Sequence, residues 1–242
     1  MSKLKKTITI LQLYPKDMNI YGDFGNTLVL QRRLEWYGYD AKIISYNQGD
    51  VFPKNVDIIV GGGGQDSGQE KIQADLLKIG DTLKTLAGDG VPMLLICGLY
   101  QLFGKFFKTA NGDVIQGIGI FDMETRGLSE RLIGNIITES PEFGEIIGYE
   151  NHSGQTFLGP TLPSLGVVRL GAGNNVADGT EGARYKNVIG SYLHGSLLPK
   201  NPRIADFLIT KAVVRKYGKM TSKTIDDQYA QQARAVAAKR PR

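Results

Sequence analysis

A single cysteine gives this sequence its clearest chemical potential. Cys97 is the only cysteine among 242 residues; it follows the apolar run 92–96 and precedes Gly98. A cysteine between a buried strand and a helix lies on a sharp turn that exposes its sulfur, and the helix N-terminus favours the nucleophilic thiolate. The opposing interpretation is a core residue, because free cysteine is among the most buried residue types. This segment alone leaves both interpretations open.

Four consecutive glycines, residues 61–64, end a second apolar segment before Cys97. Glycine permits unusual φ angles and close backbone approach, so N–H groups of this run can point toward the sulfur and form an oxyanion hole. A phosphate cradle is another use of such a loop, but neither G-x-x-x-x-G-K-[ST] nor G-x-G-x-x-G occurs in the run. A nucleotide site is therefore not predicted, and a plain flexible turn remains the alternative.

His194, one of two histidines, ends the apolar run 189–193 and precedes Gly195. Open α/β sheets bind their ligands beyond the carboxyl ends of the strands, where a histidine in this position would lie near Cys97. Taken alone, it could equally be a hydrogen-bonded edge residue. The cysteine, the glycine run and the histidine together predict a thiol nucleophile with a proton-transfer partner.

A parallel sheet is needed to bring these residues together. The first half of the chain has the sequence pattern of such a sheet. Short apolar runs alternate with helical patterns, which predicts an α/β fold with a mostly parallel central sheet and helices on both faces. The predicted strands cover residues 7–13, 41–46, 56–60 and 92–96.

Two helices are predicted between these strands. Residues 26–37 place several leucines, Leu28 among them, on one inward face. Residues 67–86 begin with Ser67 and Glu70 at the spacing of a capping box, in which each side chain bonds a free backbone N–H of the first turn. Both segments are expected to be crossover helices.

The second half of the chain is rich in β-type runs separated by Gly and Asn. After a helix at 99–107, we expect strands that extend the sheet or form an antiparallel layer, at 117–124, 132–138, 145–150, 166–170 and 188–193. Pro202 then begins a helix that Gly218 ends, and a last helix covers 224–238. We therefore expect one domain over residues 1–218, followed by a basic C-terminal helix and tail over 219–242.

Composition excludes several classes of protein. No stretch approaches the roughly 18 uninterrupted apolar residues of a membrane span, and the N-terminus lacks a signal-peptide pattern, so we expect a cytoplasmic protein without a membrane span. One cysteine and two histidines are too few for a closed zinc site. Neither a metal nor another cofactor is predicted.

The net charge of +5 is unevenly distributed. Residues 200–242 contain 11 of the 29 Lys and Arg but only 3 of the 24 Asp and Glu, which leaves the body of the chain slightly acidic. The basic end has few aromatic rings and no recognised nucleic-acid module, so nucleic acid is not an expected partner. A solvated helix or one that docks a partner is the preferred interpretation.

Four ordered segments resemble class I glutamine amidotransferases of the cobyric acid synthase type. They are GGGGQD at 61–66, CGLYQ at 97–101, YENHSG at 149–154 and GSYLHG at 190–195. The resemblance covers about residues 5 to 215 and implies a flavodoxin-like fold. Within that family it is closest to glutaminase subunits that serve an ATP-dependent Mur-ligase-like synthetase subunit acting on lipid II in peptidoglycan synthesis. The YENHSG segment and residues 131–135 carry this closer likeness.

The resemblance implies a thioester mechanism on L-glutamine. Cys97 would attack the side-chain amide, and His194 would protonate the departing ammonia and later activate water. Backbone groups at Gly63, Gly64 and Gly98 would stabilise the oxyanion.

The resemblance also suggests residues that hold the substrate. Gln101 matches a position that helps to hold glutamine. Arg131 could pair with the α-carboxylate, since a guanidinium group suits bidentate recognition, although a surface salt bridge is the alternative. His152 is expected to shape the loop over the pocket.

One departure from the family pattern concerns the group that orients the histidine. Many class I enzymes have His-x-Glu, whereas Ser196 occupies the place of the glutamate, as in the cobyric acid type. We therefore expect an Asp or Glu of the synthetase subunit to complete the site. Two alternatives remain open: a glutaminase for another acceptor such as a corrin carboxylate, and a non-catalytic glutamine-binding regulatory module.

Overall fold

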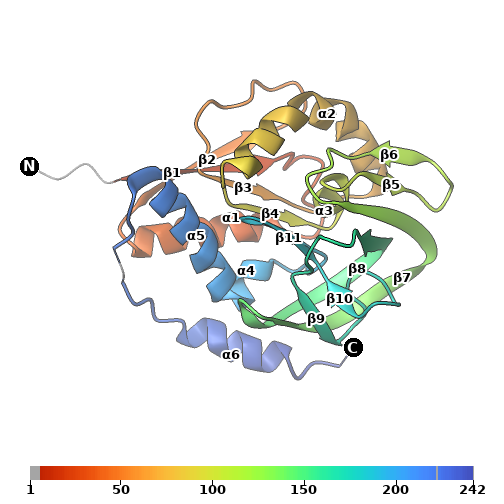
Figure 1. The fold of residues 1–242 in the computed structure, drawn as a ribbon. Coiled ribbons are helices and arrows are strands. Elements are labelled where there is room, and N and C mark those ends of the chain that lie inside the picture. The colour runs from red at the N-terminus through yellow and green to blue at the C-terminus, as the bar shows by residue number, and fades with distance from the viewer. Residues whose placement is uncertain (1–5, 222, 242) are drawn as a thin grey trace, which may run out of the picture.

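The computed structural model describes residues 6–221 and 223–241 and contains two β-sheets with helices around them (Figure 1). The first sheet has six strands in the order β11-β12-β4-β3-β1-β2. Its strands are β1 (Thr7–Leu13), β2 (Asp40–Tyr46), β3 (Ile58–Gly61), β4 (Met93–Ile96), β11 (Ala183–Tyr185) and β12 (Val188–Ser191). Every pairing except that of β11 with β12 is parallel, which confirms the predicted mostly parallel sheet.

The three strands that lead to the predicted site are buried along their whole length. Every residue of β3, β4 and β12 is buried, as expected for parallel strands that are covered on both faces. Gly61, Ile96 and Ser191 end these strands at the same edge of the sheet. The glycine run, Cys97 and the His194 segment follow directly, so the topology brings them together.

Helices cover both faces of this sheet. α1 (Phe24–Trp36) and α5 (Pro202–Tyr217) lie on one face and α2 (Asp66–Gly88) on the other (Figure 1). The chain steps across the sheet in opposite directions from β1 to β2 and from β3 to β4, so right-handed crossovers place α1 and α2 on opposite faces. α5 begins and ends where predicted, with Gly218 at a φ of +78°. No helix in the described part of the chain has the length and apolar character to cross a membrane.

The second sheet is built on one long hairpin. β7 (Met123–Ser140) and β8 (Gly144–Leu158) pair antiparallel, and four shorter strands complete the sheet: β5 (Phe106–Lys108), β6 (Val114–Gln116), β9 (Gly166–Leu170) and β10 (Thr180–Glu181). The strands expected at 132–138 and 145–150 are therefore parts of longer ones. The register of the hairpin shifts between Gly127 and Leu132, so Arg131 lies in an irregular stretch of β7.

The helix predicted over 99–107 was wrong in length. α3 covers only Gly98–Leu102, and β5 begins at Phe106. A Cβ atom at Gly104 would come within 3.0 Å of the Met123 carbonyl oxygen, so the backbone of β7 packs against the chain immediately after the helix. The segment expected as a strand over 117–124 belongs to a strand only from Met123 onward. Tertiary packing, which local propensity does not report, ends both elements.

The start of α2 and one face of α1 also differ from expectation. α2 begins at Asp66 with Gln65 at its N-cap and no side-chain cap, so Ser67 does not form a capping box. The acidic side chain of Asp66 in the first turn complements the positive end of the helix dipole instead. Leu28 of α1 is 47% exposed and contributes nothing to the core.

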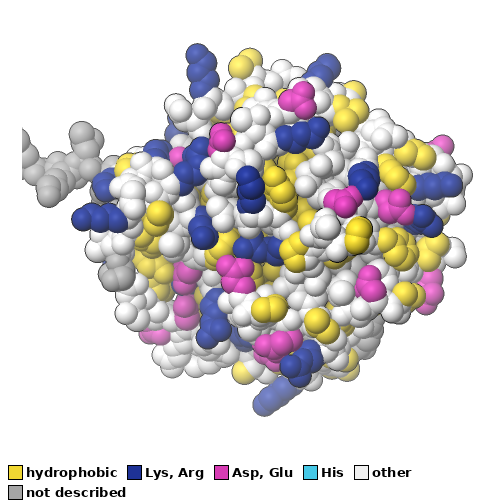
Figure 2. All heavy atoms as spheres, viewed as in Figure 1, with side chains coloured by type: hydrophobic (Ala, Val, Ile, Leu, Met, Phe, Trp, Pro, Cys, Tyr) yellow, Lys and Arg dark blue, Asp and Glu magenta, His cyan; other side chains and the backbone are white. Residues whose placement is uncertain are grey.

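The C-terminal segment lies on the body of the protein. α4 (Leu197–Lys200) and α6 (Gln228–Ala237) are held together by Arg234, which donates hydrogen bonds of 2.8 Å to the carbonyl oxygens of Lys200 and Glu145. Lys223 donates to the Trp36 carbonyl oxygen at 2.6 Å. Acidic and basic side chains are interspersed on the face shown in Figure 2. Part of the basic charge that we expected to dock a partner is therefore used within the chain.

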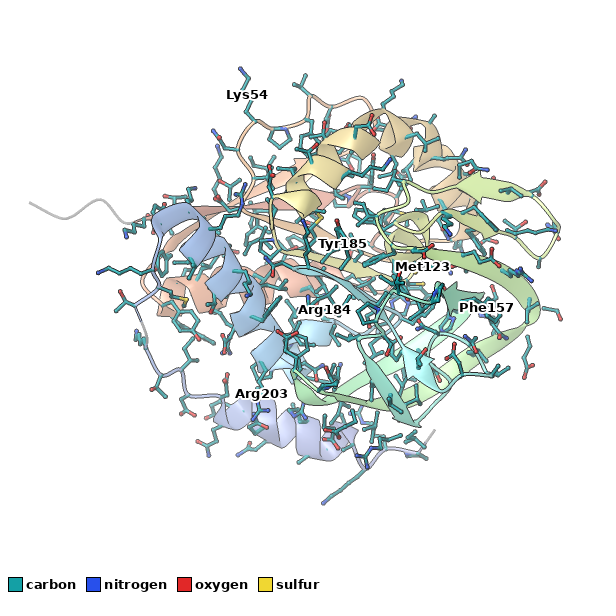
Figure 3. All side chains as sticks on the ribbon, viewed as in Figure 1. Lys54, Met123, Phe157, Arg184, Tyr185 and Arg203 are labelled. Carbon is teal, nitrogen blue, oxygen red and sulfur yellow. The ribbon has the colours of Figure 1, made fainter. Side chains whose placement is uncertain are left out.

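Arg184 connects the edge of the parallel sheet to its neighbours (Figure 3). Its guanidinium group lies 4.6 Å from the centre of the Phe207 ring in α5 and donates a hydrogen bond of 2.8 Å to Glu142 in the β7–β8 turn. A guanidinium group over an aromatic face is attracted by the ring quadrupole. β11 is thereby joined to α5 and to the tip of the hairpin.

Arg33 of α1 is the buried charge that connects three segments. Its side chain is 4% exposed and forms ion pairs with Asp206 of α5 at 2.7 Å and with Asp227, which precedes α6, at 2.5 Å. Tyr37 also donates to Asp206, at 2.8 Å. A buried guanidinium group needs such partners, because an unpaired charge in the interior is costly.

We predict that Arg33→Met destabilises the protein by about 2 to 3 kcal/mol, because it leaves two facing carboxylates without their cation. Asp206 and Asp227 are 33% and 26% exposed, which keeps the cost below that of a fully buried pair. The midpoint of urea unfolding measures the change. Arg32→Met is the matched control: this neighbouring side chain is 66% exposed and pairs only with Glu35, so a change below about 0.5 kcal/mol is expected. Equal losses in the two variants would contradict the assigned role.

Candidate active site

Cys97 lies on a strained turn between β4 and α3. Its φ and ψ are +49° and −106°, a conformation that non-glycine residues rarely adopt. Its N–H donates a hydrogen bond of 2.8 Å to the Ser191 carbonyl oxygen at the end of β12. Cys97 is buried, at 6% exposed, and also lines a cleft, so the predicted strand-to-helix elbow is present but exposes little of the side chain.

His194 lies beside Cys97, as the sequence predicted. A Cβ atom built on Gly63 would be 2.7 Å from His194 Cε1 and 3.2 Å from Cys97 Cβ, so both side chains border the same glycine. The His194 N–H donates to the Tyr149 carbonyl oxygen at 2.7 Å, which fixes the backbone. The Tyr21 ring covers the imidazole, with 4.3 Å between ring centres.

The charges around His194 favour its protonated form. Burial alone lowers the pKa of His194, but the charge of Cys97 and then the interaction with Asp23 outweigh burial and raise that pKa to about 10. A protonated imidazole beside the sulfur stabilises the thiolate. His194 is therefore set as an imidazolium near neutral pH.

Asp23 is the functional residue that the sequence analysis missed. It lies between β1 and α1, is 2% exposed, and places its Oδ2 atom 3.5 Å from His194 Nδ1. Ser196 instead donates its hydroxyl to the Gly22 carbonyl oxygen at 2.9 Å. The chain therefore supplies a carboxylate near the histidine itself, and the contribution expected from a partner subunit stays a prediction.

The interaction between Asp23 and His194 lacks the geometry of a strong hydrogen bond. The separation of 3.5 Å is longer than ordinary N–H···O bonds, and within the described ranges neither ring nitrogen of His194 has a hydrogen-bond partner. Asp23 Oδ2 accepts the Gly63 N–H at 2.8 Å. Asp23 thus supplies charge without fixing the orientation of the ring.

This bond also changes the predicted oxyanion hole. Because the Gly63 N–H donates to Asp23, it is not available to a substrate, and its predicted role as a donor was wrong. The N–H groups of Gly64 and Gly98 have no acceptor in the part of the chain that the structure describes. A Cβ atom on Gly98 would be 3.1 Å from the Gly64 nitrogen, so these amides lie close together. They are the remaining candidates.

The glycine run is required by close packing. Gly61 to Gly64 all have negative or extended φ, so unusual backbone angles are not the reason for glycine here. A Cβ atom on Gly64 would come within 2.8 Å of the Asp17 carbonyl oxygen, and one on Gly62 within 2.8 Å of Asp23 Cβ. The loop between β1 and α1 therefore packs directly on the run.

Arg131 lies in the same cleft as Cys97. The cleft has a volume of about 650 Å³. Arg131 donates to Asn151 Oδ1 at 2.6 Å and is 3.4 Å from the Tyr21 hydroxyl, and none of the described carboxylates forms an ion pair with it. A guanidinium group held in this way keeps its charge available to an anionic ligand.

Gln101 and His152 form part of the cleft wall. Gln101 accepts a hydrogen bond from Gln69 at 3.0 Å and donates to the Tyr192 hydroxyl at 3.1 Å, so its amide braces the wall. The His152 ring stacks on Tyr192 at 3.6 Å, and its Nδ1 is 2.7 Å from the Gly154 carbonyl oxygen. Burial lowers the pKa of His152 and favours its neutral form. This supports the expected structural role of His152.

Comparisons with known proteins agree with this geometry. The CobB/CobQ-like glutamine amidotransferase domain matches residues 9–202. Lipid II isoglutaminyl synthase (glutamine-hydrolyzing) subunit GatD of Staphylococcus aureus (strain N315) is 40% identical over 231 residues, which are 95% of this chain and 94% of that protein. The GatD subunit of Streptococcus pneumoniae (strain ATCC BAA-255 / R6) is 40% identical over 215 residues, 87% of this chain and 82% of that protein.

More distant relatives share less. A probable cobyric acid synthase of Methanothermobacter thermautotrophicus is 30% identical over 174 residues, which are 66% of this chain and 34% of that protein. A crystal structure of a glutamine amidotransferase superposes with a TM-score of 0.58 at 16% identity, covering 84% of this chain and 98% of the other. Another, from Thermotoga maritima, has a TM-score of 0.55 at 14% identity and covers 95% and 93%. These two structures support the fold alone, and the domain match with the closer relatives shows that the chain belongs to the CobB/CobQ-like glutamine amidotransferase family.

Proposed function

We propose that this protein hydrolyses L-glutamine to glutamate and ammonia through a thioester on Cys97 and passes the ammonia to a synthetase subunit. The observation that carries this proposal is the pairing of Cys97, on its strained turn, with a His194 whose pKa is about 10, in a cleft that also contains Arg131. Such a pair supplies a nucleophile and a proton donor at one place.

The proposed reaction has two stages. The Cys97 thiolate attacks the side-chain carbonyl carbon of glutamine, and the Gly64 and Gly98 N–H groups stabilise the oxyanion. His194 donates its proton to the leaving nitrogen, so that ammonia departs and a thioester remains. His194, now neutral, takes a proton from water, which attacks the thioester and releases glutamate. The proton returns the site to its starting state.

The acceptor is proposed from the most complete relatives. The GatD subunits are matched over nearly their whole length, whereas the chain spans about a third of the cobyric acid synthase relative. We therefore propose a heterodimer with an ATP-dependent, Mur-ligase-like subunit that amidates the D-glutamate of lipid II in the cytoplasm. A corrin carboxylate is the alternative acceptor, and identification of the subunit that co-purifies with the chain decides between them.

A silent glutamine-binding module is the other class of function. It would need neither a cysteine on a strained turn nor a histidine of raised pKa beside it, and this chain has both. Backbone strain of this kind costs of the order of 1 to 3 kcal/mol and is characteristic of reactive sites. The geometry therefore favours an enzyme.

Replacement of the sulfur is the direct test. We predict that Cys97→Ala and Cys97→Ser each abolish ammonia release from glutamine while the urea midpoint stays close to that of the wild type, because the side chain contributes chemistry more than packing. A glutamine-analogue electrophile should label the wild type stoichiometrically and neither variant. Ammonia release near the wild-type rate in either variant would refute the thioester mechanism.

Asp23 should control the pH range of the reaction. The pKa of His194 is raised above its ordinary value near 6.5, so the protonated form persists until the pH rises through about 10. Removing the Asp23 charge lowers that pKa, and we predict that Asp23→Asn moves the alkaline limb of kcat/KM to lower pH. An unchanged alkaline limb in Asp23→Asn would leave Asp23 a purely structural role.

His194→Ala should lower kcat by about 10²-fold or more through the loss of acid-base catalysis.

The Asp23→Asn variant also separates the contributions of chain and partner. Asp23 supplies charge without a short hydrogen bond, so we expect a slow, Asp23-dependent rate from the isolated chain and a faster rate in the complex. A partner carboxylate that bonds the imidazole would give this acceleration. Equal rates alone and in complex would show that the site needs no added group.

Arg131 should act in binding. We predict that Arg131→Ala raises the KM for glutamine more than it lowers kcat, and that Arg131→Lys rescues it poorly because a point charge cannot reproduce the guanidinium fork. Arg126→Ala, at an exposed position in the same strand where Arg126 pairs with Glu124, is the control and should leave the KM unchanged. Unaltered glutamine kinetics in Arg131→Ala would show that Arg131 does not bind the substrate.

A further inference from the structure

Asp66 is an acidic side chain of the cleft that the proposed mechanism does not use. It is the first residue of α2 and lines the cleft together with Cys97 and Arg131. In the described part of the chain, no other residue forms an ion pair or a side-chain hydrogen bond with its carboxylate. Nearby Asp17, by contrast, is paired with Lys71 at 2.6 Å.

Asp66 and Arg131 present opposite charges to one cleft without neutralising each other. Arg131 influences the Asp66 carboxylate electrostatically, but the two do not come within the 4.0 Å of an ion pair. Each is held from elsewhere: Arg131 by Asn151, and Asp66 by its own backbone amide at the positive end of α2. Both side chains line the same cleft of about 650 Å³, which can admit a ligand that carries both charges.

Asp66 gains from a cation in the cleft. Asp66 is an exposed residue at the cleft; partial desolvation of its carboxylate raises its pKa, and the charge of Arg131 opposes that shift. An ammonium group within hydrogen-bond distance would form a charge-assisted hydrogen bond with this carboxylate.

We propose that Asp66 binds the α-ammonium group of glutamine while Arg131 binds its α-carboxylate. The inference rests on the proposed function and deepens it, since it assigns the substrate class. The α-ammonium and α-carboxylate groups of glutamine are attached to one carbon, three carbon-carbon bonds from the amide carbon that Cys97 attacks. Two neighbouring side chains on the cleft wall are therefore needed to bind them. The site then selects free amino acids and rejects glutamine whose amino group is absent or acylated, as within a peptide.

The test compares substrates that differ only at the amino group. L-Glutamine, glutaramate, which lacks the amino group, and N-acetyl-L-glutamine are offered to the wild type and to Asp66→Asn, with ammonia release measured for the chain and its complex. For Asp66→Asn we expect kcat/KM for glutamine to fall by about 10- to 100-fold, mainly through KM, as for a lost charge-assisted hydrogen bond. Activity on glutaramate should stay unchanged, so the preference for glutamine collapses.

Two further variants test whether the charge and position of Asp66 cause the effect. Asp66→Glu keeps the charge and should recover part of the preference. Glu70→Gln removes an exposed carboxylate one turn along α2, outside the cleft lining, and should behave as the wild type. Equal losses on glutamine and glutaramate in Asp66→Asn, or no loss on either, would overturn the inference.

A binding measurement keeps this inference separate from the proposed function. Calorimetry with Cys97→Ala, with and without the added Asp66→Asn change, reports affinity for glutamine and glutaramate in the absence of turnover. If the wild type releases no ammonia alone or in complex, the proposed function fails. If turnover is normal but Asp66→Asn binds glutamine as tightly as before, only the role of Asp66 fails.

Discussion

The pairing of β4 with β12 is the constraint on which the site depends. Ser191 lies beside Ile96 in this parallel pair, and the Cys97 N–H donates to the Ser191 carbonyl oxygen immediately beyond it. This bond helps to hold Cys97 in a left-handed conformation that a free chain would leave. The same register sets the start of the segment that carries His194. Cys97 and His194 are thus positioned by one pair of buried strands, and the sheet bears the strain of the turn.

The loop between β1 and α1 forms the other wall of the site. Tyr21 covers His194, Asp23 lies beside its ring and bonds Gly63, and Met18 packs against Gly64. Buried hydrogen bonds anchor the start of this loop, because the hydroxyls of Tyr14 and Tyr46 both donate to Asp75 at 2.9 Å. The glycine run lets this loop approach closely, and its Gly63 amide holds Asp23.

The sequence predicted those site residues that a local pattern marks. Cys97 and His194 each end an apolar strand beside a glycine, and the strand and helix periodicities define the parallel sheet that aligns them. Asp23 was missed because no local pattern marks it: an aspartate before a helix is usually only a cap. It gains its role by contact with a residue more than 170 positions later.

The hairpin of β7 and β8 was read as separate short strands for a related reason. Gly127 and Gly154 lie outside the predicted strands, yet both lie inside continuous strands. At Gly127 the cause is tertiary, since a Cβ atom there would come within 2.7 Å of the Ala110 backbone nitrogen. Only the folded neighbour explains such a glycine. The role of the Gly63 amide was misjudged for the same reason. The acceptor of its N–H group is Asp23, which is distant in the sequence and is brought close only by the fold.

The hairpin also connects two parts of the cleft. Arg131 lies in its irregular stretch, and the carbonyl of Tyr149 on the opposite strand receives the His194 N–H. Tyr149 is 41% exposed on the outside of the ribbon. The same two strands therefore contain Arg131 and hold the backbone of His194. One exposed surface of the hairpin is thus connected to both residues of the proposed mechanism.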